Sequence, residues 1–339
     1  MIILGIECTA HTFGVAVASG DPRTPYSKRS TSILSNSSAK FPSLREGFIP
    51  RKLADHHALH FRSVAVEALE RAKISPRDLD GVAYSYGPGL GHSLHVGHVA
   101  ARAFSESLGI PLVGVNHALA HVEVGRFFCG LHDPLVAYVS GGNTQLLVLE
   151  GRRGSMRYRV LGETLDIGLG NLLDLVGRDL GLSPPDAVGV LKAAAKGRTM
   201  LDLPYSVKGM NLSFAGMLTA ARRLRGAAAA DLCYSVQETA FSMLCETAEK
   251  ALVVSKKRQV LLVGGNARNK RLAEMLSLVA AEHKSEFGVP PFDYCGDNGG
   301  MIALTGLFQL SSRCGLGRAP SQRVRIDEEK VCWESPAGG

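Results

Sequence analysis

A chain of 339 residues is long enough for two domains or for one domain with two lobes. Its composition, 45% hydrophobic and 20% charged, is ordinary for a globular protein, and no apolar run approaches the roughly 20 residues of a membrane-spanning helix. A net charge of +7 is compatible with a nucleic-acid partner without requiring one. The seven cysteines form no CxxC pair, so we expect reduced thiols in a cytoplasmic protein without membrane contact.

The first half of the chain predicts three strands and then alternating helices and strands. A Ser-rich surface loop is expected over 30–51, because serines and two prolines interrupt the apolar pattern there. Apolar residues at helical spacing predict helices over 51–73 and 93–109. Alternating or continuous apolar runs predict strands over 2–8, 13–19, 27–34, 79–87 and 111–117.

The same order of elements begins again near residue 134. Strand, glycine turn and strand occupy 135–151, and the other strands are expected over 156–163, 259–265 and 287–291. Helices are expected over 164–181, 232–255, 269–283 and from about 299. A repeat of half the chain predicts an α/β fold with two similar lobes around a central cleft. The predicted parts are an N-terminal lobe (1–133), a C-terminal lobe (134–312) and a C-terminal extension (313–339).

Glycine-rich turns lie where each repeat begins. Two-lobed chains of this pattern resemble the actin, hexokinase and heat-shock-ATPase superfamily, whose nucleotide phosphates bind at two hairpin turns. Here those turns are "CTA" (8–10) and "SGGNT" (140–144). A glycine hairpin alone usually only reverses the chain, but small residues also expose the backbone N–H groups that phosphate oxygens need. Asn269, in a third glycine turn, and Asp174, on a predicted helix, are candidate contacts for the rest of a nucleotide.

Two histidines four residues apart, His117 and His121, follow a predicted buried strand and share one face of the helix expected there. His56 and His60 have the same spacing, so local sequence leaves both pairs open as metal ligands. A polar helix face is the commoner use of such a pair. A zinc protease would carry a glutamate directly after the first histidine, but that position is Ala118, so the general base of a protease is missing.

A metal site at His117 and His121 needs a third ligand from another segment. Asp297 lies in a Gly-Asn-rich turn before the last helix, near the cleft if the repeat is real. Two imidazoles and a carboxylate suit iron(II) or zinc with open positions for substrate. Tyr138, just before the second glycine turn, is a candidate fourth oxygen donor.

Ordered motifs across nearly the whole chain resemble those of one family, the universal tRNA threonylcarbamoyladenosine transferases, formerly regarded as sialoglycoprotein endopeptidases. The asparagine of "SGGNT" and the turn "CGDNG" resemble the archaeal and eukaryotic branch, the catalytic subunit of the KEOPS complex. The motifs are "GIECTAHTFGVAV", "GFIPRKLADHH", "YGPGLGHSLHVG", "GVNHALAHVEVGR", "YVSGGNTQL", "GETLDIGLGN", "PYSVKGMNLSFAG", "VQETAFSML" and "CGDNGGMIA".

The resemblance implies a set of site residues and ligands. One divalent metal ion, with iron(II) favoured over zinc, is implied at His117, His121 and Asp297, with Tyr138 close by. No further catalytic residue is implied. ATP or threonylcarbamoyl-adenylate is implied in the cleft, and its expected contacts are Tyr138, Val139, Ser140, Gly141, Gly142, Asp174 and Asn269.

The resemblance also implies an activity and partners. The activity is transfer of the threonylcarbamoyl group from the adenylate to the exocyclic amine of the adenosine next to the anticodon, in tRNAs that read codons beginning with A, with release of AMP. The partners are tRNA, a separate synthase that makes the adenylate, and KEOPS-like subunits including a small kinase-like ATPase. A small-molecule kinase and a non-catalytic ATP-binding subunit are the alternatives on the same fold.

One segment departs from the family pattern. Where relatives have Pro-Gly-Gly-Pro after the predicted helix 164–181, this chain has "SPPDAV" (183–188). Ala187 replaces a glycine that lies against the nucleotide in relatives, and Leu191 stands where the archaeal branch usually has glutamate. A Cβ atom narrows the close approach to a ligand, and the loss of the acid removes a hydroxyl partner, so we expect an altered affinity at that edge.

Overall fold

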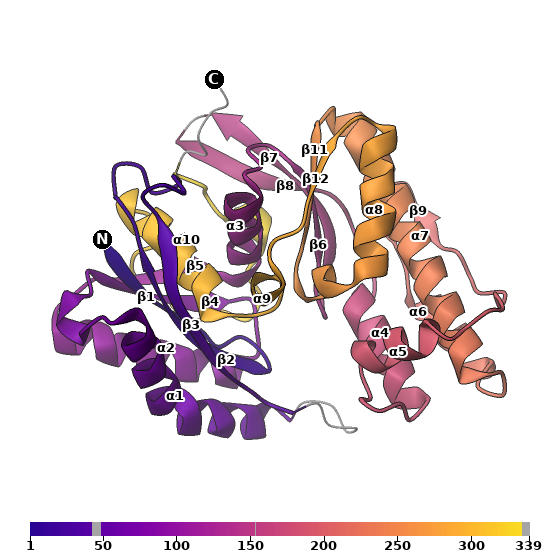
Figure 1. The fold of residues 1–339 in the computed structure, drawn as a ribbon, viewed down its shortest axis with the longest axis horizontal. Helices are drawn as coiled ribbons and strands as arrows, with labels where there is room; N and C mark the ends of the chain where they lie inside the picture. The colour runs from indigo at the N-terminus through magenta and orange to yellow at the C-terminus, as the bar shows by residue number, and fades with distance from the viewer. Residues whose placement is uncertain (43–48, 153, 334–339) are drawn as a thin grey trace.

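Two five-stranded sheets of identical topology form the framework of the computed structural model, which describes residues 1–42, 49–152 and 154–333 (Figure 1). The first has the order β3-β2-β1-β4-β5, and the second repeats it as β8-β7-β6-β11-β12. In each, three antiparallel strands are followed by two parallel ones. The predicted repeat and two-lobed α/β fold are therefore confirmed. The strands are β1 (Ile2–Glu7), β2 (Thr12–Ser19), β3 (Ser32–Lys40), β4 (Gly81–Gly87), β5 (Leu112–Asn116), β6 (Leu135–Val139), β7 (Thr144–Arg152), β8 (Ser155–Glu163), β11 (Gln259–Val263) and β12 (Glu286–Gly288), with a separate pair β9 (Val207–Lys208) and β10 (Asn211–Leu212).

The helices lie on the outer faces of the two sheets and between them (Figure 1). One pair packs on the outer face of the first sheet, α1 (Pro50–Ala72) and α2 (Gly91–Leu108). Helices that share a hydrophobic core with the second sheet are α4 (Leu169–Asp179), α5 (Ala187–Ala194), α6 (Ala215–Arg223), α7 (Ala229–Ser255) and α8 (Lys270–Glu282). The remaining helices are α3 (His117–Cys129), the single turn α9 (Phe292–Cys295) and α10 (Gly299–Ser311).

Each of the two central helices, α3 and α10, packs on the sheet of the other lobe. Helix α3 follows β5 of the first sheet but packs on β6 and β11 of the second, whereas α10 follows the second sheet and packs on β1 and β2. Both packings are close because glycines face the partner. A Cβ atom on Gly125 of α3 would lie 2.5 Å from Cγ1 of Val263, and one on Gly5 of β1 would lie 2.2 Å from the backbone nitrogen of Ala303. Both lobes thus contribute to a central buried core, in addition to a separate core in each lobe. The domain boundaries at 133/134 and 312/313 stay a prediction.

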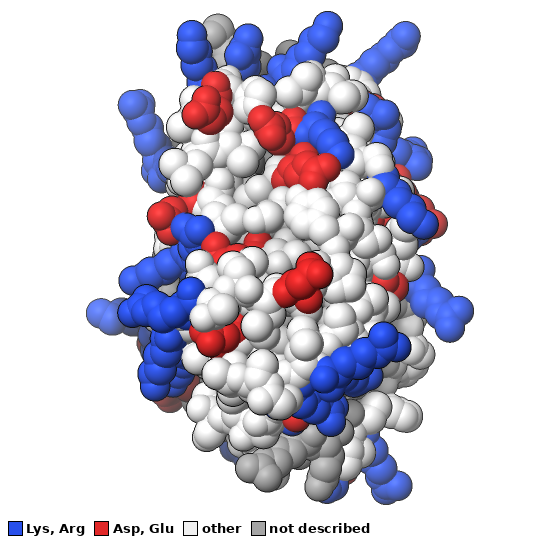
Figure 2. All heavy atoms as spheres, turned by 90° about the vertical axis from the view of Figure 1, so that its right-hand side faces the viewer, with Lys and Arg blue, Asp and Glu red and all other residues white. Residues whose placement is uncertain are grey.

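Charge on the second lobe is dispersed. Figure 2 shows the face on the right of Figure 1, where lysine and arginine side chains stand mainly at the margins and acidic groups are interspersed. No single basic patch covers the centre of this face. Within the described ranges, no helix is both long and apolar enough to span a bilayer.

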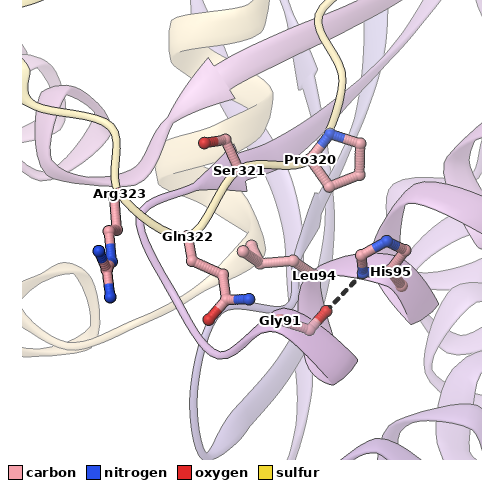
Figure 3. A pocket seen from close by; sticks show the side chains of 7 residues that line it. All are labelled: Gly91, Leu94, His95, Pro320, Ser321, Gln322 and Arg323. Atoms are coloured by element: carbon pink, nitrogen blue, oxygen red, sulfur yellow. Dashed lines mark hydrogen bonds between the residues drawn. The ribbon is translucent and has the colours of Figure 1, made fainter.

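Residues 313–333, which we call the C-terminal strap, return across both sheets. The strap pairs with the first sheet where the Gly114 N–H donates to the Gly315 carbonyl (2.9 Å) and the Ser321 N–H donates to the Tyr86 carbonyl (2.8 Å). It pairs with β8 of the second sheet through two backbone hydrogen bonds between Met156 and Val331, of 3.2 and 2.8 Å. Its middle part lies over the start of α2 and borders an open pocket of about 460 Å³, lined by Gly91, Leu94, His95, Pro320, Ser321, Gln322 and Arg323 (Figure 3).

Two expectations for local structure are wrong. The Ser-rich segment is largely an edge strand, β3, because its side chains alternate between buried and exposed positions against β2; residues 43–48 of the expected loop lie outside the described residues. The cysteines are not all reduced, since the strap folds back and joins Cys314 to Cys332 in a disulfide, whereas Cys8, Cys129, Cys233, Cys245 and Cys295 are free. The paired cysteines are 18 positions apart in the sequence, a spacing without a recognisable motif.

The close contact between β1 and α10 predicts that one added methyl group at Gly5 strongly destabilises the fold. We expect Gly5→Ala to lower the free energy of unfolding by about 3 kcal/mol, because its Cβ would overlap backbone atoms of α10 that cannot rotate away. The control is Gly216→Ala in α6, where a Cβ meets nothing within 4 Å, and it should leave stability unchanged or raise it by up to about 1 kcal/mol. Urea denaturation of both variants measures the difference; equal midpoints would show that α10 is not held in this contact.

Candidate functional site

The candidate site lies at the N-terminal ends of the two central helices. Helix α3 begins with His117 directly after β5, and the side chain of Asn116 caps it by accepting from the backbone N–H groups of Ala118 (3.0 Å) and Leu119 (3.2 Å). Asp297 immediately precedes Asn298, which caps α10 in the same way. Because α3 and α10 pack against each other, their capped ends bring residues 180 positions apart in the chain to one place.

Three of the predicted metal residues converge there. Nε2 of His121 is 3.2 Å from Oδ1 of Asp297, and Nε2 of His117 is 3.5 Å from the same oxygen. One ligand atom from each of the three lies within 4.8 Å of the other two, and among the described residues they form the group of histidine, cysteine and acidic side chains that could hold an ion. His56 and His60 are not part of such a group, although their rings lie 4.2 Å apart.

A buried carboxylate that sequence reasoning missed orients the first histidine. Glu7, at the end of β1, accepts from Nδ1 of His117 at 3.0 Å and from the backbone N–H of Thr9 at 2.8 Å. The Thr9 hydroxyl also donates to Glu7 and lies 3.1 Å from Nδ1 of His117. With its Nδ1 N–H donated to Glu7, His117 turns Nε2 toward Asp297. The signal in the sequence was an acidic residue at the end of an apolar strand. The structure shows that Glu7 is fully buried, and a buried acid needs a partner.

Burial and the neighbouring acids separate the pKa values of the two histidines. Burial opposes protonation of His117, but Glu7 and Asp297 outweigh it and raise the pKa of His117 to about 9. Burial lowers the pKa of His121, with the adjacent His117 contributing in the same direction. Burial also disfavours the charged form of Asp297, but the two imidazoles hold its pKa well below its usual range. The group therefore contains an ionised carboxylate and one neutral imidazole at neutral pH.

Tyr138 and the second glycine turn border this group. The Tyr138 ring is buried on β6 and lies 5.7 Å from the His121 ring, and burial raises the pKa of its hydroxyl well above the usual range. Val139 ends β6, and the turn closes where the Ser140 N–H donates to the Asn143 carbonyl (2.8 Å). A Cβ atom on Gly142 would meet no atom within 4 Å, so the protein itself does not require glycine there.

A second cavity, of about 700 Å³, lies among α5, α7 and α8. Asn269 lines it and caps α8 by accepting from the backbone N–H groups of Arg271 (2.9 Å) and Leu272 (3.3 Å). Its side-chain nitrogen is buried and has no hydrogen-bond partner among the described residues. Leu191, from the segment that departs from the family pattern, also lines this cavity.

Asp174 is placed differently from the other nucleotide candidates. It lies on α4, and its Oδ1 accepts from the backbone N–H of Ala187 at 2.8 Å, at the start of α5. Burial raises the pKa of this carboxyl. Asp174 does not line the cavity that contains Asn269. Its hydrogen bond is instead to Ala187, in the segment 183–188 that differs from the family pattern.

The duplicated sheets and exchanged central helices define the fold of the actin, hexokinase and heat-shock-ATPase class. Among solved structures, HypF from T. kodakarensis has a TM-score of 0.60 at 15% identity and covers 91% of this chain and 48% of its own. Component A of the (R)-2-hydroxyglutaryl-CoA dehydratase of Acidaminococcus fermentans has a TM-score of 0.54 at 14% identity, covering 91% of this chain and 98% of its own. At such identities the likeness establishes the fold alone.

Sequence relatives narrow the class to one family. The family described as "TsaD: tRNA N6-adenosine threonylcarbamoyltransferase" matches residues 31–304. A protein of that name from Thermococcus sibiricus is 44% identical over 339 residues, covering 98% of this chain and 100% of the relative. A "probable bifunctional tRNA threonylcarbamoyladenosine biosynthesis protein" of Methanosphaera stadtmanae is 42% identical, and the match covers 98% of this chain and 61% of that protein. The chain belongs to the TsaD family, which confirms the resemblance and does not favour a small-molecule kinase or a non-catalytic subunit.

Proposed function

We propose that this enzyme transfers a threonylcarbamoyl group from threonylcarbamoyl-adenylate to the exocyclic amine of the adenosine beside the anticodon of tRNA, in tRNAs that read codons beginning with A, and releases AMP. Family membership supports the reaction, because the match over residues 31–304 includes the whole second sheet, helix α3 and the residues His117, His121 and Asp297. The observation that carries the proposal to a site is the group of His117, His121 and Asp297 beside an open glycine turn.

His117, His121 and Asp297 fit one divalent metal ion. The Nδ1 atom of His117 is committed to Glu7, which leaves Nε2 as the donor, and Asp297 is ionised. Two imidazoles and one carboxylate leave coordination positions open and suit iron(II) or zinc, with Tyr138 as a further oxygen donor. The family resemblance favours iron(II). When bound, such an ion would orient the threonylcarbamoyl group and stabilise the negative charge that develops on it.

The adenylate fits between the glycine turn and the cavity at Asn269. We assign the phosphate to the backbone along Ser140, Gly141 and Gly142, since a Cβ atom on Gly142 would meet no atom within 4 Å and one on Gly141 would meet Oδ1 of Asn171 only at 3.5 Å. The unpartnered side-chain nitrogen of Asn269 can donate to the adenosine part. Asp174 can accept from a hydroxyl group only with its second oxygen, because the first is bonded to Ala187.

Positioning is the main contribution of these residues to the reaction. The exocyclic amine is a weak nucleophile because its lone pair is delocalised into the ring, so the carbamoyl carbon must be held within reach of it. The turn amides hold the phosphate that leaves when the new N–C bond forms, and burial of the histidines and Tyr138 keeps water out on one side. The target adenosine must be presented in a single-stranded loop.

Partners are expected to share the binding of tRNA. The net charge of +7 is modest, and basic side chains are scattered over the face in Figure 2. The bifunctional relative contains more sequence than this chain matches, which supports a second protein part working with this one. We assign that role to KEOPS-like subunits, including a small kinase-like ATPase, and the supply of adenylate to a separate synthase, all in the cytoplasm.

The proposed reaction has a direct test. Supplied with threonine, bicarbonate, ATP, a synthase, the KEOPS-like partners and an unmodified tRNA, the enzyme should yield threonylcarbamoyladenosine, detected by mass analysis of the nucleosides. A tRNA with guanosine in place of the target adenosine should stay unmodified, because it lacks the attacking amine. Absence of the product from the complete mixture, with metal present in the protein, would contradict the proposal.

The metal site has a test that does not require activity. His117→Ala and Asp297→Ala should each lower Zn²⁺ or Fe²⁺ affinity at least tenfold in dialysis, because each removes one of three ligands. His56→Ala is the matched control and should bind normally, since His56 is outside the group. Binding must also displace the proton of His117, so affinity should rise about tenfold per pH unit between pH 7 and the pKa of about 9. If His56→Ala lowered the metal affinity and His117→Ala did not, the metal would be bound elsewhere.

The glycine turn can be tested by adding a side chain that the fold tolerates. Gly142→Val should weaken AMP or ATP binding at least tenfold in calorimetry, because the branched side chain would occupy the path of the phosphate. Gly226→Val is the control: a Cβ there also meets nothing within 4 Å, and the position is outside the candidate site. If both variants bind nucleotide like the unvaried protein, the turn is only a hairpin.

A further inference from the structure

Helix α3 carries a second charged group that the proposed reaction does not use. Glu123 and Arg126 are both fully buried, and Nη1 of Arg126 donates to both carboxylate oxygens of Glu123, at 2.9 and 3.1 Å. Glu123 also accepts from the Tyr158 hydroxyl at 2.7 Å and from the Trp333 indole N–H at 2.8 Å. Nη2 of Arg126 donates to the His132 carbonyl at 2.6 Å. A buried carboxylate with this many donors is strongly fixed in position.

The donors to Glu123 come from three separate parts of the fold. Arg126 belongs to α3 itself, Tyr158 to β8 of the second sheet, and Trp333 to the end of the C-terminal strap. Glu123 lies two positions after His121, so its side chain projects from a different side of the helix. The network therefore ties the side of α3 that faces away from the metal group to the second sheet and the strap.

The strap contacts α3 at its beginning as well. The side-chain nitrogen of Asn116, the cap of α3, donates to the Arg325 carbonyl at 3.4 Å. That stretch of strap is itself anchored, because Arg318 donates to both oxygens of the buried Glu329 at 3.2 Å and Tyr86 of β4 donates to Glu329. The strap thus contacts the helix both next to His117 and near its middle.

We propose that the C-terminal strap is a positioning element of the metal site, acting through Trp333 on Glu123 and through Arg325 on Asn116. The inference rests on the proposed metal role of His117 and His121. Asp297 lies directly before the cap of α10, whereas both histidines belong to α3, so the donor set is correct only if the two helices keep a fixed relative position. Metal–ligand distances tolerate shifts of only about 0.2 Å. A movement of α3 along its axis would displace both imidazoles together relative to Asp297.

The Cys314–Cys332 disulfide closes the strap directly before Trp333. It joins the part that pairs with β5 to the part that pairs with β8. Cleaving it frees the end that carries Trp333, while the backbone pairing of Val331 with Met156 remains. Loss of the disulfide should therefore act on the metal site in the same direction as loss of the indole N–H, but less strongly.

Trp333→Phe is the decisive variant, because it keeps an aromatic ring and removes the N–H that Glu123 accepts. We expect its Zn²⁺ affinity to fall about tenfold, and the absorption spectrum of the Co²⁺-loaded protein to change in position or intensity. Tyr205→Phe is the matched control: it removes a 2.5 Å hydrogen bond to the carboxylate of Glu246, on α7, and should change neither quantity. Cys332→Ser should show a smaller loss of affinity than Trp333→Phe.

A second readout uses the fact that Trp333 is the single tryptophan of the chain. Because coupling between two sites is reciprocal, saturating Zn²⁺ should lower acrylamide quenching of Trp333 fluorescence in the unvaried protein. The effect should vanish in His117→Ala, which keeps the tryptophan but loses a ligand. A purely structural role of the network would lower thermal stability in Trp333→Phe without this response.

The outcomes separate this inference from the proposal on which it rests. In one outcome the wild-type protein binds Zn²⁺ and Co²⁺, and Trp333→Phe has a Zn²⁺ affinity within twofold of wild type and the same Co²⁺ spectrum. If Zn²⁺ also leaves the quenching of Trp333 fluorescence unchanged, the positioning role is overturned and the metal site stands. If the unvaried protein binds neither ion, both are overturned. A tenfold loss of Zn²⁺ affinity in Trp333→Phe, a smaller loss in Cys332→Ser and none in Tyr205→Phe support the positioning role of the strap.

Discussion

The contact between the two central helices is the constraint on which the site depends. Helices α3 and α10 pack on each other and on each other's sheets, at a distance that glycines such as Gly5 and Gly125 make possible. Their N-terminal ends therefore meet, and His117, His121 and Asp297 meet with them. Neither lobe contains the complete group, so its geometry follows from the packing between lobes rather than from either sheet alone.

Duplicated topology has not led to duplicated chemistry. In the first repeat, the turn after β1 is occupied internally, because Thr9 donates its backbone N–H and hydroxyl to Glu7, which holds His117. In the second repeat, the turn after β6 carries Gly141 and Gly142, and a Cβ atom on Gly142 would meet no atom within 4 Å. The same hairpin position thus orients His117, a proposed metal ligand, in one lobe and leaves room for the proposed phosphate in the other.

Buried charge on α3 is organised in two separate groups. One faces the cleft, where Glu7 and Asp297 raise the pKa of His117. The other joins Glu123 and Arg126 to the second sheet and the strap. Isolated buried charges are costly, so each group is paired and hydrogen-bonded. Because they lie on different sides of one helix, the proposed metal ligands share α3 with the residues that join the second sheet and the strap.

The sequence by itself determined the repeat, the two-lobed class, the family and the pairing of His117 with His121, because periodicity, spacing and ordered motifs are local properties of the chain. It left His56 and His60 as equal candidates, since helical spacing says nothing about what faces a helix. The sequence predicted Asp297 as the third ligand, and the tertiary structure places it beside the two histidines. The role of Glu7 and the pairing of Cys314 with Cys332 came from the tertiary structure alone. These depend on contacts between segments distant in sequence, which are decided only when the exchanged helices and the strap pack.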